Sequence, residues 1–258
     1  MTKRPLIDFL LNQTGAVTAL CVMGISILLA LGLTWLTIRM SGQKLMRAYS
    51  GLVPNVGATL TAGFLLFVAL VASTVLRDRA MAEQAVDLEA HALHIALSTL
   101  DKEKFPAWHH AIAAYIDKVT SDEWQDMRKG VRSHRAHDAL QALRTMAQTG
   151  LPGIAPEVRG QLTDTVKEID GARQSRLFAA ADEVPDEVWI TLAVTALVMI
   201  FFAAAIHAHV PNSAYILSIL YGLVIGAMFF TIITLDFPYR GAYAVSAQPI
   251  LRLATGLR

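Results

Sequence analysis

Histidine and acidic side chains recur at helical spacing in the middle of the chain, and this combination can bind transition metals. His91 and His94 follow Asp87 at offsets that place all three on one face of a helix. Helical bundles can build metal sites from such side chains. The commoner arrangement is a solvated face on which Arg79, Glu83 and Asp87 pair four residues apart. Metal binding at Asp87, His91 and His94 and a solvated face are therefore both kept as hypotheses.

The sequence lacks the motifs of familiar catalytic sites. It contains no GxSxG, no HExxH and no glycine-rich phosphate loop. The one cysteine, Cys21, lies in an apolar block, so neither a disulfide nor a thiolate metal site is indicated. Glu89, Glu123 and Asp126 are acidic, but each lies in a helical setting where solvated or ion-paired carboxylates are common. We predict that the protein is not an enzyme and has no cofactor.

A polar stripe lies in the second apolar block of the chain. Asn55, Thr59 and Gly63 are four residues apart and share one helix face, and Phe64 and Phe67 follow. Such a stripe could line a pore in which Phe64 or Phe67 forms an apolar constriction. Small and hydroxyl residues also let membrane helices pack closely. Both interpretations remain open at the level of sequence.

The elements that carry these residues are four long apolar segments. Of the 258 residues, 54% are apolar and 17% are charged, whereas soluble domains carry about 25% charge. About 20 apolar residues suffice to cross a bilayer as a helix. We predict membrane spans at about 16–38, 52–76, 188–207 and 213–235.

These spans divide the chain into four regions of an all-α protein. Residues 1–76 form an N-terminal membrane hairpin, 77–186 a helical extramembrane domain, 187–235 a second membrane hairpin and 236–258 a tail. No linker follows the second span, which predicts one continuous helix to about Leu100. The predicted packing stripe of this extension is Met81, Ala85, Leu88, Ala92 and Ile95. Three further helices are predicted from Pro106 to about Lys129, from about Arg132 to Gln148 and from Pro156 toward Asp182.

Charge limits the partners and indicates an orientation. The net charge of +1 and the absence of long basic runs exclude nucleic acid as a predicted partner and leave the lipid bilayer. Basic residues flank both ends of the spans. Those at the feet of the inserted domain favour cytoplasmic termini and a cytoplasmic domain in an inner or plasma membrane. The residues counted are Lys3, Arg4, Arg39, Lys44, Arg47, Arg77, Arg79, Arg173, Arg176, Arg240 and Arg252.

A charged motif follows the fourth span. Asp236 and Arg240 lie four residues apart on either side of Pro238. We expect the two charges to pair and to fix the exit of the chain from the membrane. The alternative is that Arg240 only marks the cytoplasmic boundary.

Several of these segments together resemble a bestrophin-like integral membrane family of unknown function, over about residues 51–249. The resemblance rests on Ala82-Glu83-Gln84-Ala85-Val86-Asp87-Leu88-Glu89-Ala90, Tyr115, Glu123-Trp124, Arg173 to Leu177, Val188-Trp189 and Leu235-Asp236-Phe237-Pro238-Tyr239-Arg240-Gly241.

Similarity to true bestrophins implies a homo-oligomeric anion channel whose second helix lines the axis. Rings of Arg77 and Arg79 at its cytoplasmic mouth would then favour inorganic anions. The acidic cluster of the bestrophin calcium clasp is not identified in this sequence, so calcium gating is not implied. The alternative function is a non-conducting scaffold or sensor whose helical domain binds a partner.

Overall fold

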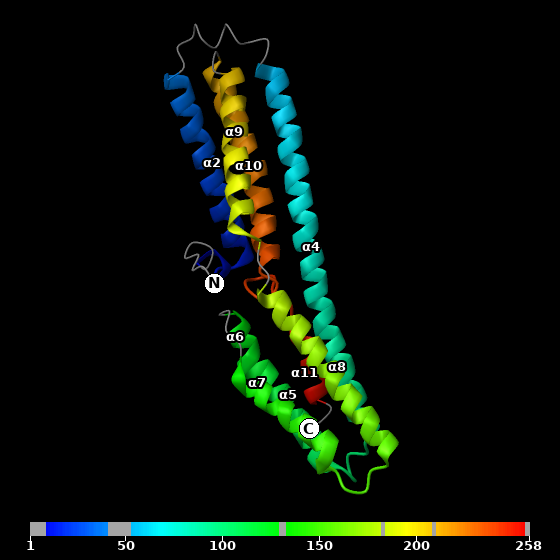
Figure 1. Cartoon of the computed structure of the whole chain (residues 1–258). Helices are drawn as coiled ribbons and strands as arrows, with labels where there is room; N and C mark the ends of the chain where they lie inside the picture. Colours follow the sequence, from blue (N-terminus) through cyan, green and yellow to red (C-terminus); the bar gives the residue numbers. More distant parts are fainter. Residues whose placement is uncertain (1–8, 41–52, 129–132, 182–183, 208–209, 256–258) are drawn as a thin grey trace. The chain divides into compact units, whose positions relative to one another are not determined.

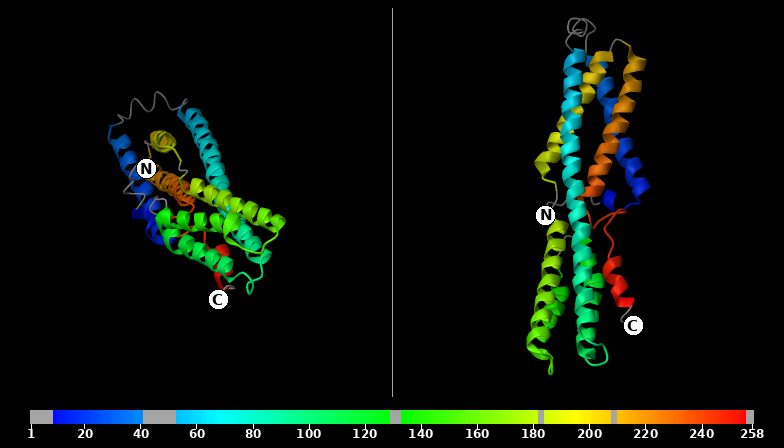
Figure 2. Two further views of the ribbon diagram at one scale, coloured as in Figure 1. Left: turned by 60° about the horizontal axis from the view of Figure 1, so that its bottom comes forward. Right: turned by 90° about the vertical axis from the view of Figure 1, so that its right-hand side faces the viewer.

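The computed structural model describes residues 9–40, 53–128, 133–181, 184–207 and 210–255, all of whose regular elements are helices (Figure 1 and Figure 2). Four of these helices are long and apolar enough to cross a membrane. They are α2 (Gly15–Met40), α4 (Val53–Thr99), α9 (Asp186–His207) and α10 (Pro211–Asp236). The predicted all-α fold with four spans is confirmed.

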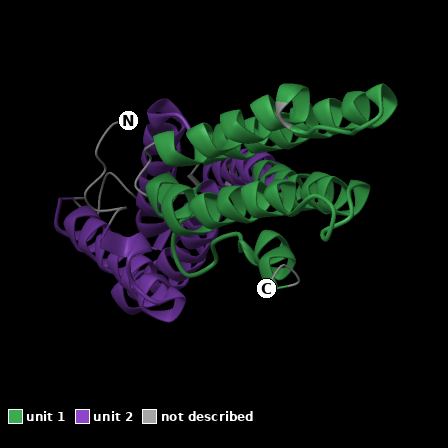
Figure 3. Ribbon diagram, turned by 90° about the horizontal axis from the view of Figure 1, so that it is seen from below, with its two compact units in different colours: residues 1–2, 78–182, 237–258 green, residues 3–77, 183–236 purple. Residues whose placement is uncertain are grey.

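The chain divides into two compact units, coloured separately in Figure 3. One, the membrane unit, comprises Lys3–Arg77 and Glu183–Asp236. The other, which we call the extramembrane unit because the sequence predicts that it lies outside the bilayer, contains Asp78–Asp182 and Phe237–Arg258. Helix α4 passes from the first into the second without interruption, which confirms the predicted continuous helix. Residues 237–258, predicted as a separate tail, belong to the extramembrane unit.

Close packing of α2 against α10 depends on two glycines of the membrane unit. A Cβ atom on Gly222 would lie 2.7 Å from the Cα of Ile27, and one on Gly226 would lie 2.7 Å from the Cα of Met23. Both distances are shorter than real Cβ contacts, so only glycine allows this approach. Small residues serve membrane helices in this way because there is no water to drive their association.

The extramembrane unit is a bundle built on the second half of α4. Its other helices are α5 (Pro106–Lys118), the π-helical turn η1 (Val119–Glu123), α6 (Trp124–Arg128), α7 (His134–Thr145), the π-helical turn η2 (Met146–Gly150), α8 (Pro156–Ala181) and α11 (Gln248–Thr255). The described parts of the three predicted helices agree with these bounds to within a few residues. Their apolar faces form one core that includes Trp108, Ile112 and Ile116.

The predicted packing stripe of α4 is wrong at two of its positions. Ala85 and Ala92 are buried, but Met81 and Leu88 are 49% and 50% exposed. The face that packs into the bundle is rotated and contains a charged residue. It consists of Ala82, Ala85, Val86, Glu89, Ala92, Leu93 and Ala96. Large apolar residues such as Met81 and Leu88 are a misleading guide to the buried face of α4, because that face is made mostly of alanine.

Candidate functional site

One face of α4 is exposed along nearly its whole length. The exposed positions are three or four residues apart, which is the spacing that keeps side chains on one side of a helix. They are Thr59, Gly63, Leu66, Leu70, Ser73, Arg77, Met81, Gln84, Leu88 and His91. We call this set the α4 stripe. It begins with small and hydroxyl residues, continues with leucine and reaches a basic residue at Arg77.

The surroundings of the predicted pore residues differ from one to the next. Gly63 has no atom within 4 Å of the position a Cβ would take, so it serves no close packing within the described part of this chain. Phe64 points to the opposite face, is 3% exposed and packs with Val68 and Val71 in the core of the membrane unit. Its side chain is therefore buried within a single copy, and its role as a constriction stays a prediction. Phe67 is half-buried, and the side chain of Asn55 lies outside the described residues.

The two arginines predicted at the mouth have different environments. Arg77 is exposed on the α4 stripe. Arg79 is turned away from it: its guanidinium lies 3.1 Å from the carboxylate of Glu83 and donates a 2.7 Å hydrogen bond to the carbonyl of Tyr243. Of these two arginines, Arg77 is the one that lies exposed on the α4 stripe.

A cluster of buried charges joins four helical elements of the extramembrane unit, α4, α5, η1 and α8. Glu89 of α4 and Glu123 of η1 are both fully buried. Arg176 of α8 donates to both carboxylates at 2.7 Å, and Arg173 of α8 binds Glu123 through two of its nitrogens. Tyr115 of α5 donates a 2.7 Å hydrogen bond to Glu89. Two positive and two negative charges balance, which is what allows them to be buried.

Electrostatics keep Tyr115 and Arg176 in their hydrogen-bond donor forms. Burial, followed by the nearby carboxylate of Glu89, raises the pKa of Tyr115 well above its ordinary value, so its phenol stays protonated. Burial alone would lower the pKa of Arg176, but the carboxylates of Glu89 and Glu123 raise it. The guanidinium also lies 5.1 Å from the ring centroid of Trp124, a cation–π distance.

The buried charges bring together residues from several of the segments that carry the family resemblance. Tyr115, Glu123 and the pair of Arg173 and Arg176 belong to separate segments of this resemblance, and the structure brings them to one place. The π-helical turn ending at Glu123 widens the helix locally, and such turns are frequent at functional sites. The sequence signal was a pair of carboxylates and a pair of arginines at helix positions that are otherwise apolar.

The segment after α10 is held by backbone contacts. Asp236 accepts a 2.7 Å hydrogen bond from the backbone N–H of Val184, both in the membrane unit. Pro238 is buried, and its carbonyl accepts a 2.6 Å bond from the N–H of Val245. Arg240 lies over the ring of Phe237 at 5.3 Å. The pairing of Asp236 with Arg240 stays a prediction.

In the segment that follows α10, Tyr239 forms contacts with α4. Its phenol donates a 2.9 Å hydrogen bond to the carbonyl of Ala82, and its ring meets that of Trp124 edge to face at 5.7 Å. Gly241 has a φ of 81°, which side-chain-bearing residues rarely adopt, so glycine is required at this turn. The segment therefore contacts α4 next to the buried cluster.

In the described residues, the structure brings no further metal-ligating side chain to Asp87, His91 and His94. Asp87, His91 and His94 are all exposed on α4, and within the described ranges no group of three histidine, cysteine, aspartate or glutamate side chains is placed to hold a metal ion. Elemental analysis of the purified protein tests the remaining hypothesis. Stoichiometric metal would support it.

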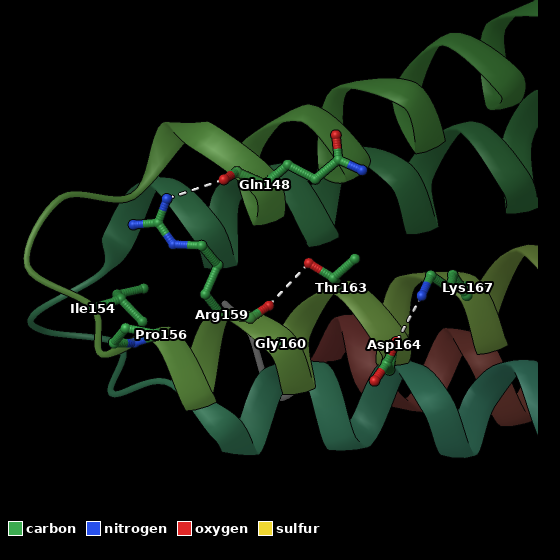
Figure 4. Close-up of a pocket in the computed structure, with 8 residues that line it drawn as sticks. All are labelled: Gln148, Ile154, Pro156, Arg159, Gly160, Thr163, Asp164 and Lys167. Atoms are coloured by element: carbon green, nitrogen blue, oxygen red, sulfur yellow. Dashed lines mark hydrogen bonds and ion pairs between the residues drawn. The ribbon is translucent and has the colours of Figure 1, made fainter.

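A cavity of about 630 Å³ opens between η2 and the start of α8 (Figure 4). Its cations are engaged by neighbouring groups. Arg159 donates to the carbonyls of Gln148 and Leu151 at 3.0 and 3.2 Å, and Lys167 lies 2.7 Å from Asp164. The two bonds of Arg159 join η2 and the residue after it to α8, whereas the pair of Lys167 and Asp164 lies within α8. The cavity therefore lies at a junction of two helical elements that these contacts hold together.

Comparisons with known proteins give a family and a fold. A family model described as the Bestrophin-like domain matches residues 24–250. No curated protein is similar in sequence to this chain. Two mutant structures of a bacterial bestrophin homologue from Klebsiella pneumoniae are similar with a TM-score of 0.70. They are 11% and 10% identical, and the alignments cover 93% and 91% of this chain and 96% and 97% of theirs. At such low sequence identity, the structural similarity shows that the fold is shared and nothing more.

Proposed function

Since the chain belongs to the bestrophin-like family, we propose that it is a homo-oligomeric ion channel in which α4 of each copy lines the conduction path. The coarse part of this proposal, an ion channel in a membrane, is supported by the family and the fold. The finer part, oligomerisation and the lining helix, rests on the α4 stripe.

The observation that carries the proposal is the exposure of Gly63 and Thr59. Small residues in a membrane helix usually serve packing, as Gly222 and Gly226 do against α2. Gly63 has no such neighbour, and Thr59 is exposed beside it. Four helices in one copy leave no wide aqueous route between them, so a path requires several copies around an axis. A ring with the α4 stripe at its centre gives these residues a role.

The chemistry of the stripe favours anions. Its only charged residue is Arg77, and one arginine from each copy makes a basic ring at the end of the membrane unit. Low-dielectric walls strengthen the field of such a ring and raise the local concentration of counter-ions. Leu66 and Leu70, 65% and 60% exposed, can supply an apolar constriction in such a path. We place the termini and the extramembrane unit in the cytoplasm.

Purified protein in planar bilayers tests the proposal. We expect currents in symmetric chloride, and a reversal potential under a chloride gradient that indicates anion selectivity. A Gly63→Leu variant should lose most of the conductance while keeping its fold, because within the described part of the chain no atom lies within 4 Å of an added Cβ. The matched control is Gly32→Leu in α2, where a Cβ also meets nothing within 4 Å. Silent membranes from folded oligomer would contradict the channel.

A non-conducting scaffold is the second candidate, and one observation favours it. The extramembrane unit exposes Met81, Leu88 and Phe178, an apolar surface of the kind that binds partners. Normal oligomers without conductance would support the scaffold over the channel.

A further inference from the structure

Apolar side chains border a groove between α4 and α8 of the extramembrane unit. The groove has a volume of about 530 Å³. Met81 and Phe178 at its edges are 49% and 64% exposed, although the sequence predicts that this unit lies outside the bilayer. Exposed apolar groups of this size around a hollow indicate a surface that another molecule covers. We call this the α4–α8 groove, lined by Asp78, Met81, Ser175, Phe178, Ala179 and Ala181.

A second exposed aromatic lies on the other side of α4. Tyr243 is 51% exposed, and its backbone carbonyl is fixed by Arg79. Within the extramembrane unit, α8 lies on one side of α4 and the segment leading to α11 lies on the other (Figure 2, right). The contacts agree, because Asp78 and Met81 face the groove whereas Arg79 faces Tyr243.

We propose that Tyr243 of one copy inserts into the α4–α8 groove of the next copy in the ring. This inference rests on the proposed function, since it requires several copies around α4. In a closed ring of identical copies, one surface of each copy binds a different surface of the next copy. The groove and Tyr243 are such a pair, and they lie on different sides of α4 (Figure 2, right).

The chemistry of the two surfaces is complementary. Tyrosine, phenylalanine and methionine are the residue types enriched at the centres of protein interfaces. A tyrosine ring can contact both Phe178 and the thioether of Met81, and aromatic and sulfur contacts are each favourable. The hydroxyl of Ser175 gives the phenol a hydrogen-bond partner. Because Arg79 holds the backbone at Tyr243, little ordering is required on docking.

Cross-linking between engineered cysteines tests the contact. The one native cysteine is first removed by Cys21→Ser. Phe178→Cys and Tyr243→Cys are then introduced singly and together, and the protein is treated in detergent with a short bis-maleimide. The double variant should give a ladder of bands that ends at the full ring, because each copy links to both neighbours. The single variants should stay largely unlinked. A matched control pairs Tyr243→Cys with His137→Cys, an exposed position on α7.

Light scattering on the same samples separates this inference from the proposed function. Oligomeric mass with a ladder only in the double variant supports the contact. Oligomeric mass with reactive thiols and no ladder overturns the contact and leaves the ring. Monomeric mass overturns both. A ladder of equal strength in the His137 control would show random collision and would also overturn the contact.

A substitution gives an independent measurement. Tyr243→Asp should lower the oligomeric fraction on dilution at least tenfold, because a carboxylate would enter an apolar groove. Tyr243→Phe should keep most of the oligomer. Equal behaviour of the two variants would contradict insertion of the ring.

Discussion

Arg176 binds Glu89, Glu123 and the sulfur of Met127, and it also lies over the ring of Trp124. Its side chain is fully buried. Ion pairs of this kind are weak evidence of net stability, since removing charges from water is costly. Removing one member is different, because the remaining charges stay buried without a partner. The cluster therefore fixes which side chains face the centre of the bundle.

Arg176→Met is the residue-scale prediction. It leaves two carboxylates with one arginine and should lower the free energy of unfolding by about 3–5 kcal/mol. Denaturant titration in detergent, followed by tryptophan fluorescence, measures the change. The control is Lys167→Met, which breaks the pair with Asp164 at the surface, where both side chains are more than 60% exposed. That change should cost at most about 1 kcal/mol. Similar losses in the two variants would contradict the role of the cluster.

At the scale of elements, α2 and α10 pack closely because two positions of α10 have no side chain. Gly222 and Gly226 are four residues apart and present one smooth face to the backbone of α2. Helix α4 approaches its neighbours differently, through Phe64, Val68, Val71 and Val75. The first contact tolerates no added atoms, whereas the second can repack.

Gly222→Ala and Gly226→Ala are the element-scale prediction. Each added methyl lies within 2.7 Å of backbone, so the helices must separate, and overpacking typically costs about 1–3 kcal/mol. The yield of folded protein and its thermal unfolding midpoint should both fall. Gly32→Ala is the matched control, because its methyl meets nothing within 4 Å. A drop in the control as large as in the variants would show that the close approach is not the cause.

At the scale of the whole molecule, the proposed function requires an assembly of copies. In that proposal, the α4 stripe, an exposed surface in one copy, forms the wall of a path when several copies surround an axis. The charge of Arg77 then acts together with its equivalents. Because exposed charges are screened beyond about 8–10 Å at physiological salt, the effect requires Arg77 to lie close to the ions.

Arg77→Glu is the prediction at this scale. It turns a basic ring into an acidic one and should shift the permeability ratio from anions toward cations by at least about tenfold, which is ~1.4 kcal/mol. The reversal potential under a salt gradient measures it. Arg135→Glu on α7 makes the same charge change at an exposed position and should leave the ratio unchanged. An unchanged ratio in the Arg77 variant would exclude α4 as the wall near this residue.

The sequence alone determined the four spans, the helical class and the unbroken α4, because these follow from hydropathy and the absence of a break after Leu76. It also showed the polar face of Thr59 and Gly63. The sequence did not decide whether this face packs against another helix. Small residues occur both in close helix contacts and on exposed faces, and only the atoms around each residue distinguish the two cases.

The tertiary structure decided which charges are buried. Glu89 and Arg176 are 87 residues apart, and no local pattern shows that they meet. It also separated Arg77 from Arg79, two residues apart, since a turn of about 200° along a helix sends them to different surroundings. Sequence periodicity places side chains around one helix, whereas their chemistry depends on what the other helices bring to each side.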